Sequence, residues 1–120
     1  MNPPRVIVVD DETMLVEPLA RYLKMKGCAV DLFDDSERAL AALAGGTYDV
    51  GLFDINMPSV SGIELATRAR AHHDGIRIIF MTGDIDQEQI ATRTAGLAHY
   101  SLLQKPFDLA TLLALIFGKG

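Results

Sequence analysis

Acidic residues directly follow two of the most apolar stretches of the sequence. Asp10 and Asp11 follow RVIVV, and Asp54 follows DVGLF, with Asn56 two residues further on. Carboxylates that gather around one crevice repel each other, which raises the pKa of at least one of them unless a cation lies among them. Mg²⁺ suits such a place, because it prefers oxygen ligands and usually takes one or two carboxylates together with a phosphate. If the fold brings these residues together, they form a candidate site for a divalent ion.

Two further residues extend this chemistry to phosphoryl transfer. Thr82 follows the apolar run RIIFM, and Lys105 follows SLLQ. An ammonium group and a hydroxyl are the kinds of group that stabilise phosphoryl oxygens as charge shifts during transfer. A carboxylate can itself accept a phosphoryl group as an acyl phosphate. Asp54 is therefore the candidate nucleophile, with Thr82 and Lys105 beside it.

Each of these residues, taken singly, also has a structural explanation. The acid pair at Asp10 could cap a helix, and the other polar residues are common in turns and at strand exits. The turn candidates are Asp54, Asn56, Pro58 and Gly62, then Thr82, Gly83 and Asp84, then Lys105 and Pro106. An ordered set of acid pair, Asp, Thr and Lys-Pro at successive strand ends is much harder to obtain by accident, so we favour the site.

The elements that carry these residues alternate regularly along the chain. Apolar runs at 5–9, 29–33, 49–53, 77–81 and 101–104 alternate with segments of helical period at 13–26, 36–44, 62–71, 86–95 and 108–117. Such alternation predicts an α/β fold, a doubly wound five-stranded parallel sheet with helices on both faces. Because the crevice of such a sheet lies beyond the carboxyl ends of its strands, all the candidate residues are expected at one edge.

The expected helix boundaries have recognisable sequence signals. Gly27 ends the first helix, Ser36 and Asp108 cap the second and fifth, and Gly45-Gly46 closes the second. Pro18 falls inside the first helical pattern, where it removes a backbone donor, so we expect a kink or a late start there.

The last expected helix, DLATLLALIFG, has one acidic residue, Asp108, as its only charge. Leu115 and Phe117 fall off its main apolar face and are expected to meet either a partner or a neighbouring domain. The residues that share that face, and should be core, are Leu109, Leu112, Leu113 and Ile116.

Composition limits the classes of function. The chain has 120 residues, 49% hydrophobic and 22% charged, with net charge −5, which suits one compact domain at 1–120. An acidic chain is a poor nucleic-acid binder, so no direct nucleic-acid contact is expected. No apolar run approaches a membrane span and the N-terminus lacks the regions of a signal peptide, so we expect no membrane insertion and a cytoplasmic location.

The cysteine and the histidines are assigned no chemistry. Cys28 precedes AVDLF and is expected to be a small core residue. The three histidines show no ligand spacing with a cysteine or a carboxylate cluster, so they are expected at the solvated surface. They are His72, His73 and His99.

Four sequence elements together resemble the receiver domain of bacterial two-component response regulators. They are VIVVDDE, DVGLFDINMPSVSGIEL, IIFMTGD and QKPFDL, and the resemblance extends over essentially the whole chain. It implies a flavodoxin-like strand order 2-1-3-4-5 and a cis bond before Pro106. It also implies a phosphoryl group taken from a histidine kinase or a histidine phosphotransfer protein, and an output partner or domain that the sequence does not name.

The resemblance assigns a role to each candidate residue. Asp54 is then the phosphoacceptor, and Thr82 and Lys105 contact the phosphoryl oxygens. The implied Mg²⁺ ligands are Asp11, Asp54 and the backbone carbonyl of Asn56, with Asp10 assisting through water.

The chain departs from the family pattern on the expected fifth strand. Family members commonly place a Tyr or Phe three residues before the conserved lysine, where this sequence has Leu102. Tyr100 lies two residues earlier, in a stretch from Gly96 that is about two residues longer than the common pattern.

The predicted function is that of a phosphoacceptor switch, whose only catalysis is self-phosphorylation and self-dephosphorylation with Mg²⁺. One alternative is a small Mg²⁺-dependent phosphohydrolase that turns over external substrates through an aspartyl phosphate. Asn56 lies where a common phosphatase motif has an Asp for leaving-group protonation. Another alternative is a pseudo-receiver that only binds partners, which the complete set of site residues disfavours.

Overall fold

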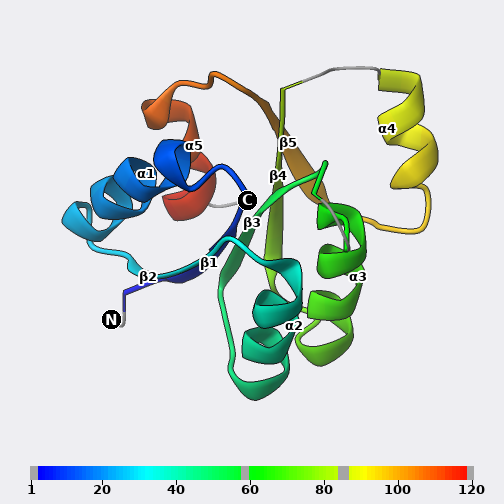
Figure 1. Ribbon diagram of the computed structural model, residues 1–120, viewed down its shortest axis with the longest axis horizontal. Helices are drawn as coiled ribbons and strands as arrows, with labels where there is room; N and C mark the ends of the chain where they lie inside the picture. Colours follow the sequence, from blue (N-terminus) through cyan, green and yellow to red (C-terminus); the bar gives the residue numbers. More distant parts are fainter. Residues whose placement is uncertain (1–2, 58–59, 84–86, 119–120) are drawn as a thin grey trace.

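Within residues 3–57, 60–83 and 87–118, which the computed structural model describes, a five-stranded parallel sheet has the order β2-β1-β3-β4-β5 (Figure 1). The strands are β1 (Arg5–Val9), β2 (Ala29–Phe33), β3 (Val50–Asp54), β4 (Arg77–Thr82) and β5 (Tyr100–Gln104). The helices are α1 (Thr13–Met25), α2 (Ser36–Gly45), α3 (Gly62–His72), α4 (Gln87–Arg93) and α5 (Leu109–Phe117). The predicted doubly wound fold is confirmed, as is the strand order that the resemblance implied.

The sheet separates two hydrophobic cores. Successive strand residues point to opposite faces, so Val8 packs on the side of α1 and α5, whereas Ile7 and Val9 pack on the side of α2 and α3. Figure 1 shows these two helix pairs on opposite sides of the sheet. Ile90 of α4 joins the core of α2 and α3, and Cys28 is buried beside α1 as expected. Both faces are covered, so the inner strands β1, β3 and β4 are buried along almost their whole length, whereas the edge strand β2 contains the exposed Asp31.

The predicted boundary signals are largely present. Gly27 has φ +97° just after α1, a left-handed conformation that favours glycine at a helix end. Asp108 caps α5, because its carboxylate accepts from the Ala110 backbone N–H at 3.0 Å.

The predicted cap of α2 was wrong. Asp35 is the N-cap and accepts from the Glu37 backbone N–H at 2.9 Å. Ser36 is instead the first helical residue, and its buried hydroxyl oxygen accepts from the Val60 backbone N–H at 3.2 Å. The serine therefore ties α2 to the loop after β3 and is not available as a cap.

Of the two alternatives expected at Pro18, a kink or a late start of the helix, the structure excludes the late start. α1 begins at Thr13 and contains Pro18. Its first turn is already closed before the proline, because the backbone N–H groups of Leu15 and Val16 both donate to the Glu12 carbonyl, at 3.0 and 3.2 Å.

The prediction for the apolar face of α5 was partly right. Leu112 and Ile116 are fully buried and Leu113 is partly buried, but Leu109, in the first turn, is 37% exposed. Leu115, expected on the surface, packs against the core of α1 and α5, whereas Phe117 is half exposed.

Candidate functional site

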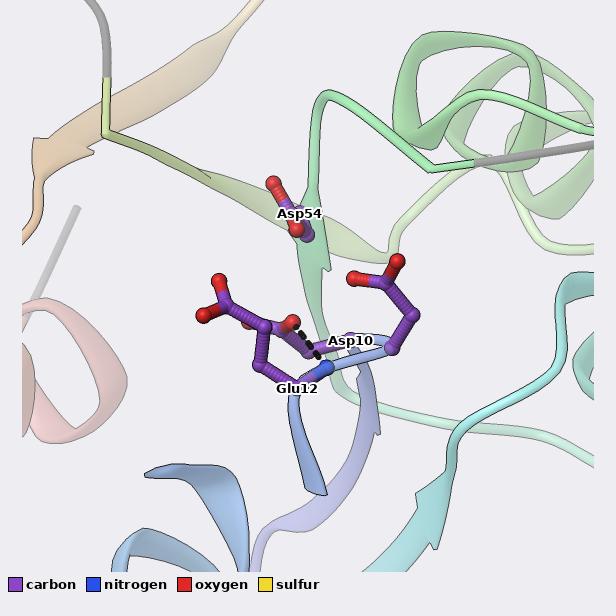
Figure 2. A group of neighbouring side chains, drawn as sticks. Asp10, Glu12 and Asp54 are labelled. Atoms are coloured by element: carbon purple, nitrogen blue, oxygen red, sulfur yellow. Dashed lines mark hydrogen bonds between the residues drawn. The ribbon is translucent and has the colours of Figure 1, made fainter. Parts of the chain in front are cut away.

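The carboxyl ends of β1 and β3 bring two buried carboxylates side by side. Val9 of β1 pairs with Phe53 of β3. Asp10 and Asp54, which follow these two residues, therefore lie at the same edge of the sheet. Asp10 is 0% exposed and Asp54 5% exposed. Figure 2 shows the carboxylates of Asp10, Glu12 and Asp54 around one common space. The two buried acids thus face a crevice lined by further acids.

Lys105, at the exit of β5, supplies the positive charge of this crevice. Its Nζ lies 2.6 Å from Oδ2 of Asp10, 3.4 Å from Oε1 of Glu12 and 3.6 Å from Oδ2 of Asp54. Its backbone N–H donates to the Thr82 carbonyl at 2.7 Å, and the peptide bond to Pro106 is cis, as the resemblance implied. Lys105 thus contacts the ends of three strands. They are β1 with Asp10, β3 with Asp54 and β4 with Thr82.

The surroundings change the pKa of both charged partners. Burial and the nearby Asp10 carboxylate raise the pKa of Asp54 to about 6, although Lys105 and the Asn56 backbone N–H act in the opposite direction. Burial lowers the pKa of Lys105, but its hydrogen bond to Asp10 and the charges of Asp10 and Asp54 outweigh this, so its pKa is raised. Lys105 therefore stays charged. The positive charge near Asp54 is too small to offset burial and the repulsion from Asp10.

Asn56 lies in the loop after β3 and is exposed. Its backbone N–H donates to Oδ1 of Asp54 at 3.2 Å, which helps to fix that carboxylate. Its side-chain Oδ1 accepts from Nη1 of Arg93, at the end of α4, also at 3.2 Å. Asn56 therefore connects the candidate nucleophile with a helix that begins more than thirty residues later.

Gly62, the first residue of α3, sets the backbone beside Asp54. A Cβ placed on Gly62 would lie 2.1 Å from the Asp54 carbonyl oxygen, which no side chain can do. The Gly62 N–H donates to the Ile55 carbonyl at 3.2 Å. Only glycine allows this close approach, so the first residue of α3 packs directly against the backbone at the end of β3.

Thr82 ends β4 next to the crevice. It is 1% exposed and pairs with Gln104 across the sheet. Asp54 of β3 pairs with Met81 of β4. Thr82 follows Met81 and therefore lies one residue closer to the crevice. Thr82 thus lies at the edge of the sheet where the acids and the lysine meet.

The donor set of the crevice fits a hard divalent ion. Carboxylate oxygens of Asp10, Asp11, Glu12 and Asp54 all lie within 4.8 Å of one another. All are oxygen donors, the type that Mg²⁺ and Ca²⁺ prefer. Burial is the main cause of the raised pKa of Asp54, and repulsion from Asp10 is the second cause, which a bound cation would offset.

All six predicted site residues therefore lie at one edge of the sheet, where the strands have their carboxyl ends. They are Asp10, Asp11, Asp54, Asn56, Thr82 and Lys105. Asp84 and Pro58 lie outside the residues that the structure describes. His72 and His99 are exposed and His73 half-buried, and no histidine belongs to the acidic cluster found among the described residues.

Two residues of the site had no assigned role in the sequence analysis. The Glu12 carboxylate reaches Lys105, and its place next to the acid pair was a usable signal. Arg93 reaches Asn56, and no spacing in the sequence indicated this contact.

Tyr100 and Leu102 occupy different places around β5. The Tyr100 ring packs on Phe80 with centroids 5.4 Å apart, and its hydroxyl lies 2.9 Å from Oγ1 of Thr94, just after α4. Leu102 is partly buried against the same core. The aromatic residue of β5 is thus Tyr100, whose hydroxyl contacts the residue after α4, and the position of Leu102 has no aromatic side chain.

The strand order and the acidic crevice at the carboxyl ends define a flavodoxin-like α/β domain with a candidate cation site. The family model described as response regulator receiver domain matches residues 6–117. The chain belongs to this family. Among the described residues, no helix is long and apolar enough to cross a membrane.

Curated relatives are similar over almost the whole chain. Response regulator MprA of Mycolicibacterium vanbaalenii is 36% identical over 113 residues, which cover 93% of this chain and 48% of the relative. MprA of Mycobacterium avium is 36% identical over 111 residues, 92% of this chain and 48% of the relative. The chain thus spans about half the length of the curated relatives it matches.

Solved structures show the same fold. A response regulator receiver protein from Pseudomonas putida is 32% identical with a TM-score of 0.86, covering 99% of both chains. The response regulator TrrA from Thermotoga maritima, solved in complex with Mg²⁺-BeF, is 29% identical with a TM-score of 0.74, covering 95% of this chain and 96% of TrrA. These similarities do not support the phosphohydrolase alternative.

Proposed function

We propose that Asp54 accepts a phosphoryl group in a Mg²⁺-dependent reaction and that the chain acts as a phosphorylation switch. The observation that carries this proposal is the position of Asp54, buried at the end of β3 beside Asp10 and 3.6 Å from the Lys105 ammonium. Membership of the receiver family supports it, as does the Mg²⁺-BeF complex of TrrA.

Asp54 acts as the nucleophile of the transfer. Its Oδ forms a bond to phosphorus while the nitrogen–phosphorus bond of a phosphohistidine breaks, and the electron pair of that bond returns to the imidazole. With a pKa of about 6, Asp54 is mainly ionised at pH 7 and above, as a nucleophile must be. Lys105 and Thr82 are positioned to donate hydrogen bonds to the phosphoryl oxygens as charge develops on them.

The metal ligands in this proposal are Asp11, Asp54 and the backbone carbonyl of Asn56, with Asp10 acting through water. Asp11 is exposed and free to turn toward an ion, whereas Asp10 is buried and already bonded to Lys105. When bound, the ion offsets negative charge on the phosphoryl oxygens.

The proposed phosphodonor is a histidine kinase or a histidine phosphotransfer protein. A cavity of about 570 Å³ beside Asp10 and Lys105 is lined by apolar side chains of α1 and of the segment after β5. Met14 is 88% exposed, Leu15 61% and Leu109 37%, all at this edge. Apolar side chains around a polar reaction centre suit a protein partner that covers the crevice during transfer.

The output is a further proposal. We take residues 1–120 as one receiver module whose phosphorylation changes binding to an output partner or domain. The curated relatives are about twice as long as this chain, which leaves room in them for an attached output region.

Acetyl phosphate and p-nitrophenyl phosphate distinguish the proposed function from its alternatives. We expect acetyl phosphate with Mg²⁺ to give at most one acid-labile phosphate per chain, and p-nitrophenyl phosphate to show no turnover above that of the Asp54→Asn variant. Sustained Asp54-dependent release of p-nitrophenol would contradict the proposal in favour of a phosphohydrolase. Complete absence of labelling would favour a pseudo-receiver.

A further inference from the structure

Helix α4 is a short element at the β4–β5 side of the sheet. Figure 1 shows it at the opposite end of the molecule from α1. It spans Gln87–Arg93, and of the described side chains from 88 to 95 only Ile90 and Thr94 are buried. Its position therefore depends on a small apolar anchor together with polar contacts at its C-terminal end.

One of these polar contacts reaches the candidate phosphoacceptor. Nη1 of Arg93 donates to Oδ1 of Asn56 at 3.2 Å, and the Asn56 backbone N–H donates to Oδ1 of Asp54 at 3.2 Å. Arginine at a helix C-terminus is favourable to the helix dipole by itself. That explains the residue type but not the contact across 37 positions of sequence with the loop after β3.

The contact is made at the protein surface beside Asp54. Asn56 and Arg93 are both exposed, whereas Asp54 is 5% exposed. Hydrolysis of an aspartyl phosphate needs water from this side: its oxygen bonds to phosphorus, the phosphorus–Oδ bond breaks and Asp54 leaves as a carboxylate. The proton of the water passes to the inorganic phosphate that forms. Groups fixed beside Asp54 on this side obstruct the approach of that water.

We propose that Arg93 is a positioning residue that holds the Asn56 amide over the solvent side of Asp54 and so lengthens the lifetime of the aspartyl phosphate. The inference rests on the proposed phosphorylation of Asp54. Phosphorylation adds a charge of about −1.5 to −2, which attracts the guanidinium toward the site rather than away from it. The same contact links α4 to the chemistry, because loss of the phosphoryl group removes that attraction.

The experiment measures the decay of the phosphorylated protein. The wild type and its variants are labelled with acetyl phosphate and Mg²⁺, the donor is removed by desalting, and intact mass is followed with time. The variants are Arg93→Met, Arg93→Lys, Asn56→Ala and the double variant Arg93→Met with Asn56→Ala. Arg68→Ala is the matched control, because Arg68 is an exposed arginine paired with Glu64 on α3.

We expect Arg93→Met to accelerate decay about threefold to tenfold, as loss of one charge-assisted hydrogen bond near the reacting group implies. Asn56→Ala should act similarly, and the double variant should decay no faster than the faster single variant. Arg93→Lys keeps a charge and a donor and should restore part of the lifetime, while Arg68→Ala should match the wild type. In the unphosphorylated protein, the Asn56 side-chain amide resonance should move in Arg93→Met but not in Arg68→Ala.

The inference would be overturned if Arg93→Met decayed at the wild-type rate. It would also be overturned if the acceleration in the double variant equalled the product of the two single effects. Either outcome would leave the phosphorylation of Asp54 unaffected. Failure to label the wild type at all would contradict the proposed function and this inference with it. If Arg93→Met does not fold by circular dichroism, Arg93→Ala gives the same comparison.

Discussion

The ammonium nitrogen of Lys105 lies 2.6 Å from Oδ2 of Asp10, a carboxylate that is completely buried. Its other acidic neighbours in the crevice are Glu12, with Oε1 at 3.4 Å, and Asp54, with Oδ2 at 3.6 Å. The lysine therefore compensates the buried charge of Asp10 first and is close enough to reach a phosphoryl group on Asp54 by a small movement.

Replacing Lys105 by methionine should destabilise the fold. The substitution leaves Asp10 buried without its cation, and loss of one partner of a buried pair typically lowers the free energy of unfolding by about 3 kcal/mol. Urea unfolding at pH 7.5 without Mg²⁺ measures the change, and added Mg²⁺ should restore part of it. Lys24→Met, at an exposed position of α1, is the control. Equal stability of Lys105→Met and the wild type would contradict the structural role of the pair.

Asp54 should make stability depend on pH. Its pKa is raised from 3.8 to about 6, so the native state binds this proton more tightly than the unfolded chain does. The free energy of unfolding of the wild type should therefore fall, relative to Asp54→Asn, as pH rises through this window, and the difference should level off above it. Without Mg²⁺ at pH 7.5, Asp54→Asn should be more stable by on the order of 1–2 kcal/mol.

Thermal unfolding from pH 4 to pH 8, with and without Mg²⁺, tests this dependence. Bound Mg²⁺ should reduce the advantage of Asp54→Asn, because the ion offsets the repulsion from Asp10. Asp74→Asn, an exposed acid after α3, should follow the wild type. The expectation fails if Asp54→Asn and the wild type keep the same difference at every pH.

Asp11 should contribute strongly to Mg²⁺ affinity. It is an exposed member of the acidic cluster, and no ion pair to Lys105 holds its carboxylate in the structure's described contacts. Asp11→Ala should weaken binding at least about tenfold in a Mg²⁺ titration, because loss of even an outer-shell partner of a metal typically costs about tenfold or more in affinity. Glu12→Gln should weaken it less, because Glu12 is paired with Lys105. Equal affinities of Asp11→Ala and the wild type would exclude the assignment.

Gly62→Ala should disturb the end of β3. The new Cβ would meet the Asp54 carbonyl oxygen at 2.1 Å, so the backbone has to shift, and overpacking of this kind costs about 1–3 kcal/mol of unfolding free energy. Gly45→Ala at the end of α2 is the matched control, because nothing lies within 4 Å of its added Cβ. Urea unfolding compares the two variants, and equal effects would show that the close approach is unimportant.

The sequence was sufficient for the fold and for most of the site. Parallel strands end at one edge, so residues that follow apolar runs, such as Asp10, Asp54 and Lys105, meet there whatever the details of the loops. The strand order was different in kind: it came from resemblance to a family, because alternation alone leaves several topologies open.

The errors and omissions share a physical cause. Asp35 is the cap in place of Ser36, whose hydroxyl bonds to Val60, and Leu109 lines the open cavity beside Asp10 and Lys105. The contact of Arg93 with Asn56 depends on where α4 lies relative to the loop after β3. Local sequence signals describe one element at a time, so contacts between distant elements were not predicted.

The site of phosphorylation tests the central claim most directly. The protein is incubated with acetyl phosphate and Mg²⁺, reduced with borohydride to mark the acyl phosphate, digested and mapped by mass spectrometry, alongside Asp54→Asn and an otherwise identical sample with EDTA. We predict a single modified position at Asp54 in the wild type and none in Asp54→Asn or without Mg²⁺. Undiminished labelling of Asp54→Asn, or modification of a different acid in the wild type, would contradict the assignment of Asp54 as phosphoacceptor.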